Sequence, residues 1–256
     1  MIKVVGAGLA GSEAAWYLAN RGEQVELIEQ KPLRFSPAHK SADFCELVCS
    51  NSLKSDDASG NACGLLKEEL RRLGSLTMEA AAHTRVPAGG ALAVDRDKFS
   101  AYVTQKLRSH PNVHIVVREE TELPEAGIVA TGPLTEGALY AAIGARFGGG
   151  LHFYDATAPV VTAESVDLAH TFTGDRYGRG TGDYINCPLT KEEYGLFVQE
   201  LLAAEKVTLR EFEKREIFEG CMPVEVMASR GKDALRFGTF TPVGLAGEDG
   251  KRPYAV

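Results

Sequence analysis

The sequence predicts an α/β protein with a doubly wound, mainly parallel sheet, followed by a second, smaller α+β domain. Three observations support this prediction. Strand-like and helix-like segments alternate over the first part of the chain, to about Asp155. The first two strand-like segments flank a glycine-rich turn and a helix, as in a β–α–β unit. After Asp155 the alternation gives way to short strand-like segments and a loop rich in Gly and Arg.

The β–α–β unit covers the first 29 residues. Residues 2–5 (IKVV) are predicted to form a short buried strand, and the glycine-rich turn that follows opens a helix. This helix continues to Gly22, a suitable C-terminal cap. Residues 25–29 (VELIE) form the second predicted strand, which ends at an acidic residue, Glu29.

Later segments extend the alternation. A helix is predicted over residues 61–73, in which Glu68 and Arg72 are four apart and form a supporting ion pair. Asp95 is placed to cap another helix. Two buried strands are predicted at residues 113–117 (VHIVV) and 127–130 (GIVA), and the second leads into a sharp turn, Ala130-Thr131-Gly132-Pro133.

The second domain is predicted to start near residues 160–175. Residues 153–161 and 183–188 are strand-like, and a Gly- and Arg-bearing loop, 174–182, joins them. Thr190 and Glu193 form a capping box for a helix over residues 191–204. We therefore expect a nucleotide-binding domain over residues 1–165 and an incomplete insertion or substrate domain over residues 166–256.

Composition narrows the class of protein. The chain has 44% hydrophobic and 25% charged residues, as an ordinary globular protein does. Its net charge of −7 argues against broad non-specific nucleic-acid binding, although a local basic cluster lies within 24 residues. The absence of an apolar run long enough to cross a bilayer, and of a cleavable N-terminal signal, predicts a cytoplasmic protein with no membrane partner. The basic cluster consists of Lys31, Arg34, His39, Lys40 and Lys54.

Five cysteines, an odd number, argue against a disulfide framework. Their spacing fits neither a zinc site nor an iron–sulfur cluster, so no metal is expected. Cys45, Cys63 and Cys187 are interpreted as small buried hydrophobic residues.

The glycine-rich turn matches the GxGxxG pattern in the context that a dinucleotide site requires. Gly6 permits the tight turn, Gly8 lets the backbone approach a pyrophosphate, and Gly11 lets the helix pack on the strand. The helix N-terminus supplies amides for the phosphates. Glu29 accepts hydrogen bonds from an adenosine ribose and repels an added phosphate, which favours FAD or NAD over NADP. The candidate cofactor-binding residues are Gly6, Ala7, Gly8, Leu9, Ala10, Gly11, Glu29 and Gly132.

Two cysteines lie in polar surroundings. Cys221 directly precedes a predicted short helix that begins near Pro223 and is capped by Gly231, and a helix N-terminus lowers the pKa of a thiol. Cys49 is followed by three residues, 50–52 (SNS), whose side chains are able to donate hydrogen bonds to a ligand. Spacing alone leaves open whether either cysteine is reactive.

Six segments together resemble one family, the bacterial folate- and FAD-dependent tRNA (uracil-5-)-methyltransferases, which make 5-methyluridine at position 54 of the T loop. The resemblance covers the chain from end to end, and the two segments that contain cysteines are the most specific. The segments are ELVCSNSLKS (46–55), PAGGALAVDRDKF (87–99), ATGPLT (130–135), FYDATAP (153–159), DYINCPLTKEEY (183–194) and FEGCMPVEVMASRG (218–231).

The resemblance implies three ligands, namely FAD, methylenetetrahydrofolate as one-carbon donor and the T arm of tRNA, with NADH or NADPH as reductant. It implies that Gly6–Gly11 and Glu29 hold FAD. Cys221 matches the cysteine expected to attack carbon 6 of the uracil, which makes carbon 5 nucleophilic. Cys49 matches a second catalytic cysteine near the flavin, which helps to remove the proton from carbon 5. Reduced flavin supplies the hydride that turns methylene into methyl.

Two features depart from the family pattern. Cys45 stands where a non-thiol residue is expected and would be able to form an off-pathway disulfide with Cys49. Family members continue well beyond residues 251–256 (KRPYAV), so we expect an N-terminal portion with impaired FAD binding and no methylation in isolation. Three alternatives stay open: the related flavoproteins that modify the tRNA wobble uridine, a non-catalytic dinucleotide-binding module, and an NAD-linked oxidoreductase. Arg176 and Arg179 join the basic cluster as candidate tRNA contacts.

Overall fold

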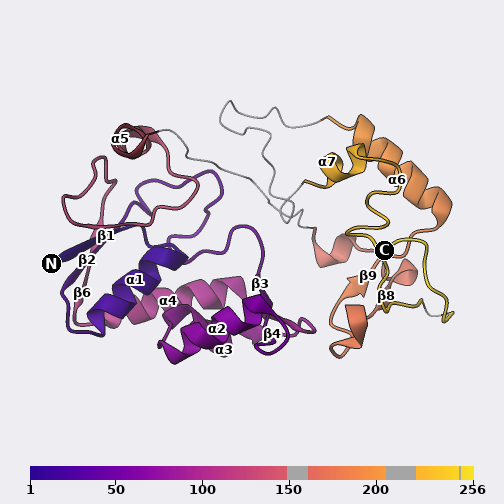
Figure 1. The fold of residues 1–256 in the computed structure, drawn as a ribbon, viewed down its shortest axis with the longest axis horizontal. Coiled ribbons are helices and arrows are strands. Elements are labelled where there is room, and N and C mark those ends of the chain that lie inside the picture. The colour runs from indigo at the N-terminus through magenta and orange to yellow at the C-terminus, as the bar shows by residue number, and fades with distance from the viewer. Residues whose placement is uncertain (149–160, 206–222, 248) are drawn as a thin grey trace. The chain divides into compact units, whose positions relative to one another are not determined.

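The computed structural model describes residues 1–148, 161–205, 223–247 and 249–256. The chain divides into two compact units, shown in Figure 1. The first unit comprises Met1–Val86 and Ala91–Phe153, and the second comprises Pro87–Gly90 and Tyr154–Val256. Within these described ranges, no helix has the length and apolar character needed to cross a membrane.

A parallel sheet forms the centre of the first unit. In the described residues it has four strands in the order β6-β2-β1-β7. Val4 of β1 is in register with Leu27 of β2, and Leu27 with Ile115 of β6. The strands are β1 (Ile2–Val5), β2 (Val25–Glu29), β6 (Val113–Val117) and β7 (Gly127–Val129).

Helices cover both faces of this sheet, which confirms the predicted doubly wound architecture (Figure 1). Alternate residues of a strand point to opposite faces. Val4 and Leu27 accordingly pack with α1 (Leu9–Ala19) and α4 (Arg96–Ser109). Val5 and Ile28 pack with Leu139 of α5 (Gly137–Phe147) on the other face.

Local signals in this unit agree with the predictions, with one correction. Asp95 accepts a 3.1 Å hydrogen bond from the Lys98 N–H and caps α4. The helix α1 ends at Ala19, and Gly22 follows with φ +88°. The prediction that both later strands are buried is wrong, because β6 and β7 are the outer strands of the described sheet and leave side chains such as Val117 and Ile128 exposed.

The first unit also contains an antiparallel sheet, whose strands contact α2 (Ala62–Arg72) and α3 (Leu76–His83). Its order is β3-β5-β4, with β3 (Ser52–Ser55), β4 (Arg85–Val86) and β5 (Ala91–Val94). The predicted helix is α2, and the predicted ion pair joins Arg72 Nε to Glu68 Oε1 at 3.0 Å. An additional helix, α3, is buried on most sides and so lacks the amphipathic period that would have predicted it.

The second unit, as far as it is described, contains one antiparallel strand pair, β8 (Phe172–Thr173) and β9 (Ile185–Asn186), and two α-helices. The predicted capping box is present at α6 (Lys191–Ala203), where Thr190 N donates to Glu193 at 2.8 Å. α7 (Val224–Ser229) follows Pro223. The predicted strand at 153–161 lies almost wholly outside the described residues. Three 3₁₀ turns are described: η1 (Ala163–Ser165), η2 (Leu168–His170) and η3 (Arg176–Gly178).

Candidate functional site

A pocket of about 340 Å³ lies in the first unit at the carboxyl ends of the parallel strands. Its lining comes from the glycine-rich turn after β1, from the end of β2 and the loop beyond it, and from the residues that follow β6 and β7. Ligands of open α/β sheets bind at this edge, outside the carboxyl ends of the strands. The fold therefore places the pocket where a nucleotide is expected.

The three glycines of the turn serve different purposes. Gly6 has φ +95°, and a Cβ there would lie 2.6 Å from the Ala130 carbonyl oxygen. A Cβ on Gly11 would lie 1.8 Å from the Gly6 carbonyl oxygen, so this glycine lets α1 pack against the turn. A Cβ on Gly8 would meet nothing within 4 Å among the described residues. Gly6 and Gly11 thus serve chain packing, whereas Gly8 borders open space.

The N-terminus of α1 has the properties of an anion site. Gly8 is the N-cap residue, and in the described part of the chain no side chain caps this end and no acidic residue lies in the first turn. The first amides of a helix have no partner within the helix, and the helix dipole favours negative charge there. Together with the open space at Gly8, these amides fit a diphosphate.

Glu29 is held rigidly at the end of β2. Its side chain is 7% exposed, and its two carboxylate oxygens accept hydrogen bonds from Ala7 N (2.9 Å) and Lys31 N (3.0 Å). A carboxylate has about four acceptor positions, so acceptor capacity remains for ribose hydroxyls. The carboxylate of the predicted residue is thus fixed in position by two backbone N–H groups.

The turn after β7 forms another wall of the pocket and contains the predicted Gly132. Gly132 has φ +76°, and its carbonyl oxygen accepts a 2.7 Å hydrogen bond from the Thr135 hydroxyl. Thr135 also bonds the hydroxyl of Thr131 at 2.7 Å. All but one of the predicted cofactor-binding residues line the pocket, and the exception, Gly11, lies behind the turn.

The basic cluster predicted from the sequence is not a free basic face. Lys31 is 6% exposed, and its amine donates to the Asp43 carbonyl and lies 3.8 Å from Glu46. Lys31, Arg34 and His39 line the pocket, whereas Lys40 and Lys54 are exposed. Three of the five residues of this cluster therefore belong to the pocket wall.

Two arginines of the pocket are also paired. Arg34 donates to Glu119 through Nη1 and to Glu136 through Nη2 (2.9 Å), and the hydrogen bond to Glu136 is the main cause of the raised pKa of Arg34. Arg118 donates to Glu26 at 3.0 Å and to Glu120 at 2.8 Å. Sequence reasoning missed the pairs of Arg34 with Glu119 and Glu136, and of Arg118 with Glu26, because each joins segments 85–102 residues apart. The available signal was the position of the acids, directly after β6 and directly before α5.

His39 is half-buried in the pocket wall beside Ser36, whose hydroxyl bonds its Nδ1 atom. Burial lowers the pKa of His39 below its ordinary value of 6.5, and the nearby charge of Lys31 lowers this pKa further. Glu46 and Glu29 act in the opposite direction. The imidazole is thereby kept neutral more readily than that of an exposed histidine.

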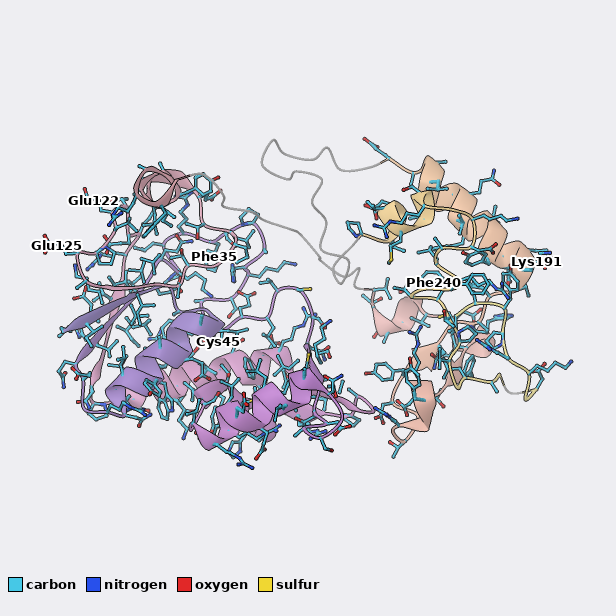
Figure 2. The ribbon with its side chains drawn as sticks, viewed as in Figure 1. Phe35, Cys45, Glu122, Glu125, Lys191 and Phe240 are labelled. Carbon is cyan, nitrogen blue, oxygen red and sulfur yellow. The ribbon has the colours of Figure 1, made fainter. Side chains whose placement is uncertain are left out.

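The structure separates the cysteines by environment. Cys45 is 1% exposed, lies close to α1 (Figure 2) and donates its N–H to the Ala7 carbonyl at 2.9 Å. Burial raises the pKa of its thiol to about 12. The interpretation of Cys45 as a buried hydrophobic residue is confirmed, but the same interpretation of Cys63 and Cys187 is wrong because both are exposed.

Cys49 is exposed and lies one residue beyond Val48, which lines the pocket. The loop that contains it is anchored to β5, since the Asn51 amide donates to the Val94 carbonyl at 3.2 Å and Val94 N donates back to the Asn51 carbonyl at 3.0 Å. Asn51 therefore supports the loop. Cys221, the other predicted catalytic residue, lies outside the described residues.

The chain is similar in sequence to known proteins over its whole length. The family model described as "Glucose inhibited division protein A" matches residues 1–256. A protein of Acetivibrio thermocellus, named methylenetetrahydrofolate--tRNA-(uracil-5-)-methyltransferase TrmFO, is 56% identical over 259 residues, which are 100% of this chain and 59% of that protein. A Geotalea uraniireducens protein of the same name is 58% identical with the same coverage.

The chain thus spans 59% of the length of these curated relatives. Among solved structures, one described as "Structure of Aquifex aeolicus GidA in the form II crystal" matches with a TM-score of 0.39 and 20% identity. That match covers 48% of this chain and 20% of the other.

Proposed function

Since the chain belongs to the glucose inhibited division protein A family, we propose that its first unit binds FAD and that the whole protein methylates tRNA. The reaction is formation of 5-methyluridine at position 54 of the T loop, with methylenetetrahydrofolate as the carbon donor. The single observation that carries the FAD site is the pocket around Gly8 and Glu29. The choice of reaction is supported by the relatives at 56% and 58% identity, whose names specify a methylenetetrahydrofolate-dependent tRNA (uracil-5-)-methyltransferase.

Different residues of the pocket bind different parts of the cofactor. The amides at the start of α1 bind the diphosphate, and Gly8 leaves room for it. Glu29 accepts hydrogen bonds from the adenosine ribose, and the turn at Gly132 forms the wall beside the cofactor. When bound and reduced by NADH or NADPH, FAD supplies the hydride that completes the methyl group.

Two cysteines carry the chemistry on the uracil. Cys221 adds to carbon 6 as a thiolate, which makes carbon 5 nucleophilic toward the one-carbon unit. Cys49 removes the proton from carbon 5, which breaks the bond from carbon 6 to Cys221 and releases that thiolate. This role of Cys49 is supported by its exposure and by its place beside the pocket wall. Residues 166–256 contribute to an insertion domain that binds the T arm, with Arg176 and Arg179, both exposed, as candidate contacts. We place the protein in the cytoplasm because its proposed substrate is tRNA.

A trapping experiment tests this function. The chain and a version extended to the length of its relatives are incubated with FAD, NADPH, methylenetetrahydrofolate and a T-loop RNA that contains 5-fluorouridine. Mass spectrometry should detect a covalent protein–RNA adduct in the extended protein, and Cys221→Ala should abolish it. Retained FAD binding without an adduct in the extended protein would instead favour a non-catalytic dinucleotide-binding module.

A further inference from the structure

Arg34 lies five residues beyond Glu29, in the region that decides which ribose a dinucleotide site accepts. In sites for phosphorylated dinucleotides, a nearby arginine accommodates the ribose 2′-phosphate. Arg34 lines the pocket, so its position alone would suggest a site for a 2′-phosphorylated ligand.

The guanidinium of Arg34 is already committed to two carboxylates. Nη1 donates to Glu119, which follows β6, and Nη2 donates to Glu136 at 2.9 Å. Glu136 is the N-cap residue of α5, so its backbone is fixed by the start of that helix. All three side chains are partly exposed. To bind Arg34, a 2′-phosphate would have to displace both carboxylates, whose two negative charges exceed the single positive charge of the arginine.

The other cations of the pocket are also paired and so do not offer a 2′-phosphate an alternative partner. Lys31 is directed to the Asp43 carbonyl and Glu46, and Arg118 to Glu26 and Glu120. Across the described lining, five carboxylates face three cations, which leaves an excess of two negative charges. The carboxylates are Glu29, Glu46, Glu119, Glu120 and Glu136, and the cations are Lys31, Arg34 and Arg118.

We propose that Arg34, held between Glu119 and Glu136, is a specificity-determining residue that restricts the pocket to dinucleotides with a free ribose 2′-hydroxyl. This inference rests on the proposed dinucleotide site and adds the residues that select among dinucleotides. Glu29 binds the ribose, whereas the two acids on Arg34 withhold the cation that a 2′-phosphate needs. Neutralising these acids while keeping their shape should release Arg34 for that phosphate.

The test compares two probes that differ only in the 2′-phosphate, ADP-ribose and 2′-phospho-ADP-ribose. Calorimetric titration measures both dissociation constants for the unmodified chain and for the double variant Glu119→Gln/Glu136→Gln. The unmodified chain should prefer ADP-ribose. The double variant should shift the ratio toward the phosphorylated probe by about fivefold or more, the effect of one released guanidinium charge about 4 Å from the phosphate in water.

Two further variants test whether the shift depends on Arg34 and on the position of the removed charges. Adding Arg34→Met to the double variant should reverse most of the shift, because the released cation is then gone. Glu68→Gln removes a partly exposed, arginine-paired carboxylate on α2, outside the pocket lining, and should leave the ratio unchanged. Circular dichroism confirms that each variant is folded.

The outcomes separate this inference from the proposed function. Binding of ADP-ribose with the same ratio in the unmodified chain and the double variant would overturn the role of Arg34 and leave the dinucleotide site intact. A shift that survives Arg34→Met would also overturn it, since bulk charge would then explain the change. No binding of either probe by any folded version, including one extended to the length of the relatives, would overturn both the inference and the proposed site.

Discussion

The carboxylate of Glu29 accepts a 2.9 Å hydrogen bond from the backbone N–H of Ala7, so the end of β2 secures the turn that follows β1. The second carboxylate oxygen accepts a 3.0 Å bond from Lys31 N. One buried side chain thus supports two segments of the pocket wall. Glu29 therefore has a structural role beside the binding role that we propose for it.

Replacing Glu29 should separate these two roles. Glu29→Ala leaves two backbone N–H groups without their acceptor in a buried site, and we expect the free energy of unfolding to fall by about 1–3 kcal/mol. Glu29→Gln keeps one acceptor oxygen, so its loss should be smaller. Urea denaturation measures both values, and Glu23→Gln, at an exposed position just before β2, is the control. Equal stability of Glu29→Ala and the control would contradict the structural role.

Replacement by alanine should destabilise the protein much more at Gly11 than at Gly8. At Gly11 the new methyl would lie 1.8 Å from the Gly6 carbonyl oxygen, and such overpacking costs about 1–3 kcal/mol or more. At Gly8 the methyl meets nothing within 4 Å among the described residues, so the variant should lose at most about 1 kcal/mol through poorer capping.

Ligand affinity provides a second test at Gly8. The methyl of Gly8→Ala occupies the space that a diphosphate requires, so the affinity for ADP-ribose should fall by about tenfold or more, the effect of losing one good hydrogen bond. Thermal unfolding and calorimetric titration give the two quantities. A Gly8→Ala variant that binds normally would show that the diphosphate does not approach this residue.

Cysteine reactivity should follow burial. The thiol of Cys45 has a pKa of about 12, and only the thiolate reacts with iodoacetamide, so Cys45 should stay unmodified at pH 8 in the native protein. Exposed Cys63 and Cys187 should be labelled. Peptide mapping before and after denaturation in guanidinium measures each site. Labelling of native Cys45 at the rate of Cys63 would contradict its burial, whereas all three should be labelled after denaturation.

The elements that the sequence predicted best are those with a local cause. The strand–turn–helix at the N-terminus, the Asp95 cap and the Thr190–Glu193 capping box all depend on residues within a few positions of one another. The helix α3 was missed because its burial removes the alternation of polar and apolar residues that reveals a helix.

The candidate site was predicted only in part, because some of its features have a local cause in the sequence and others do not. The turn from Gly6 to Gly11 and the acid at the end of β2 form a motif with fixed spacing. The environment of Lys31 and Arg34 depends on carboxylates whose proximity only the folded chain creates. Residues that read as a basic cluster in the sequence therefore include side chains in the pocket wall that are paired with acids. Exposed Cys63 and Cys187 show in turn that cysteine content alone does not predict burial.

His39 should make stability depend on pH below neutrality. Its folded-state pKa is lowered from 6.5, chiefly by burial, so the unfolded chain takes up a proton more readily than the folded chain. The contribution of His39 to stability is thus present above pH 6.5 and is lost as the pH falls from 6.5 through the lower folded-state pKa.

The test is the melting temperature of the unmodified chain and of His39→Asn between pH 5 and pH 8. The unmodified chain should lose more stability than the variant on acidification, because asparagine has no proton to take up. Exposed His114 on β6 supplies the matched control, and His114→Asn should follow the unmodified chain at every pH. If His39→Asn and the unmodified chain lose stability in parallel, the half-buried imidazole beside Ser36 and Lys31 is not the group that titrates. Carboxylates such as Glu79 and Asp183 would not explain that loss either. Their pKa values are lowered from 4.5 and 3.8, mainly by hydrogen bonds from Lys106 and from the Gly89 N–H respectively, so their contribution to stability is lost only below these values.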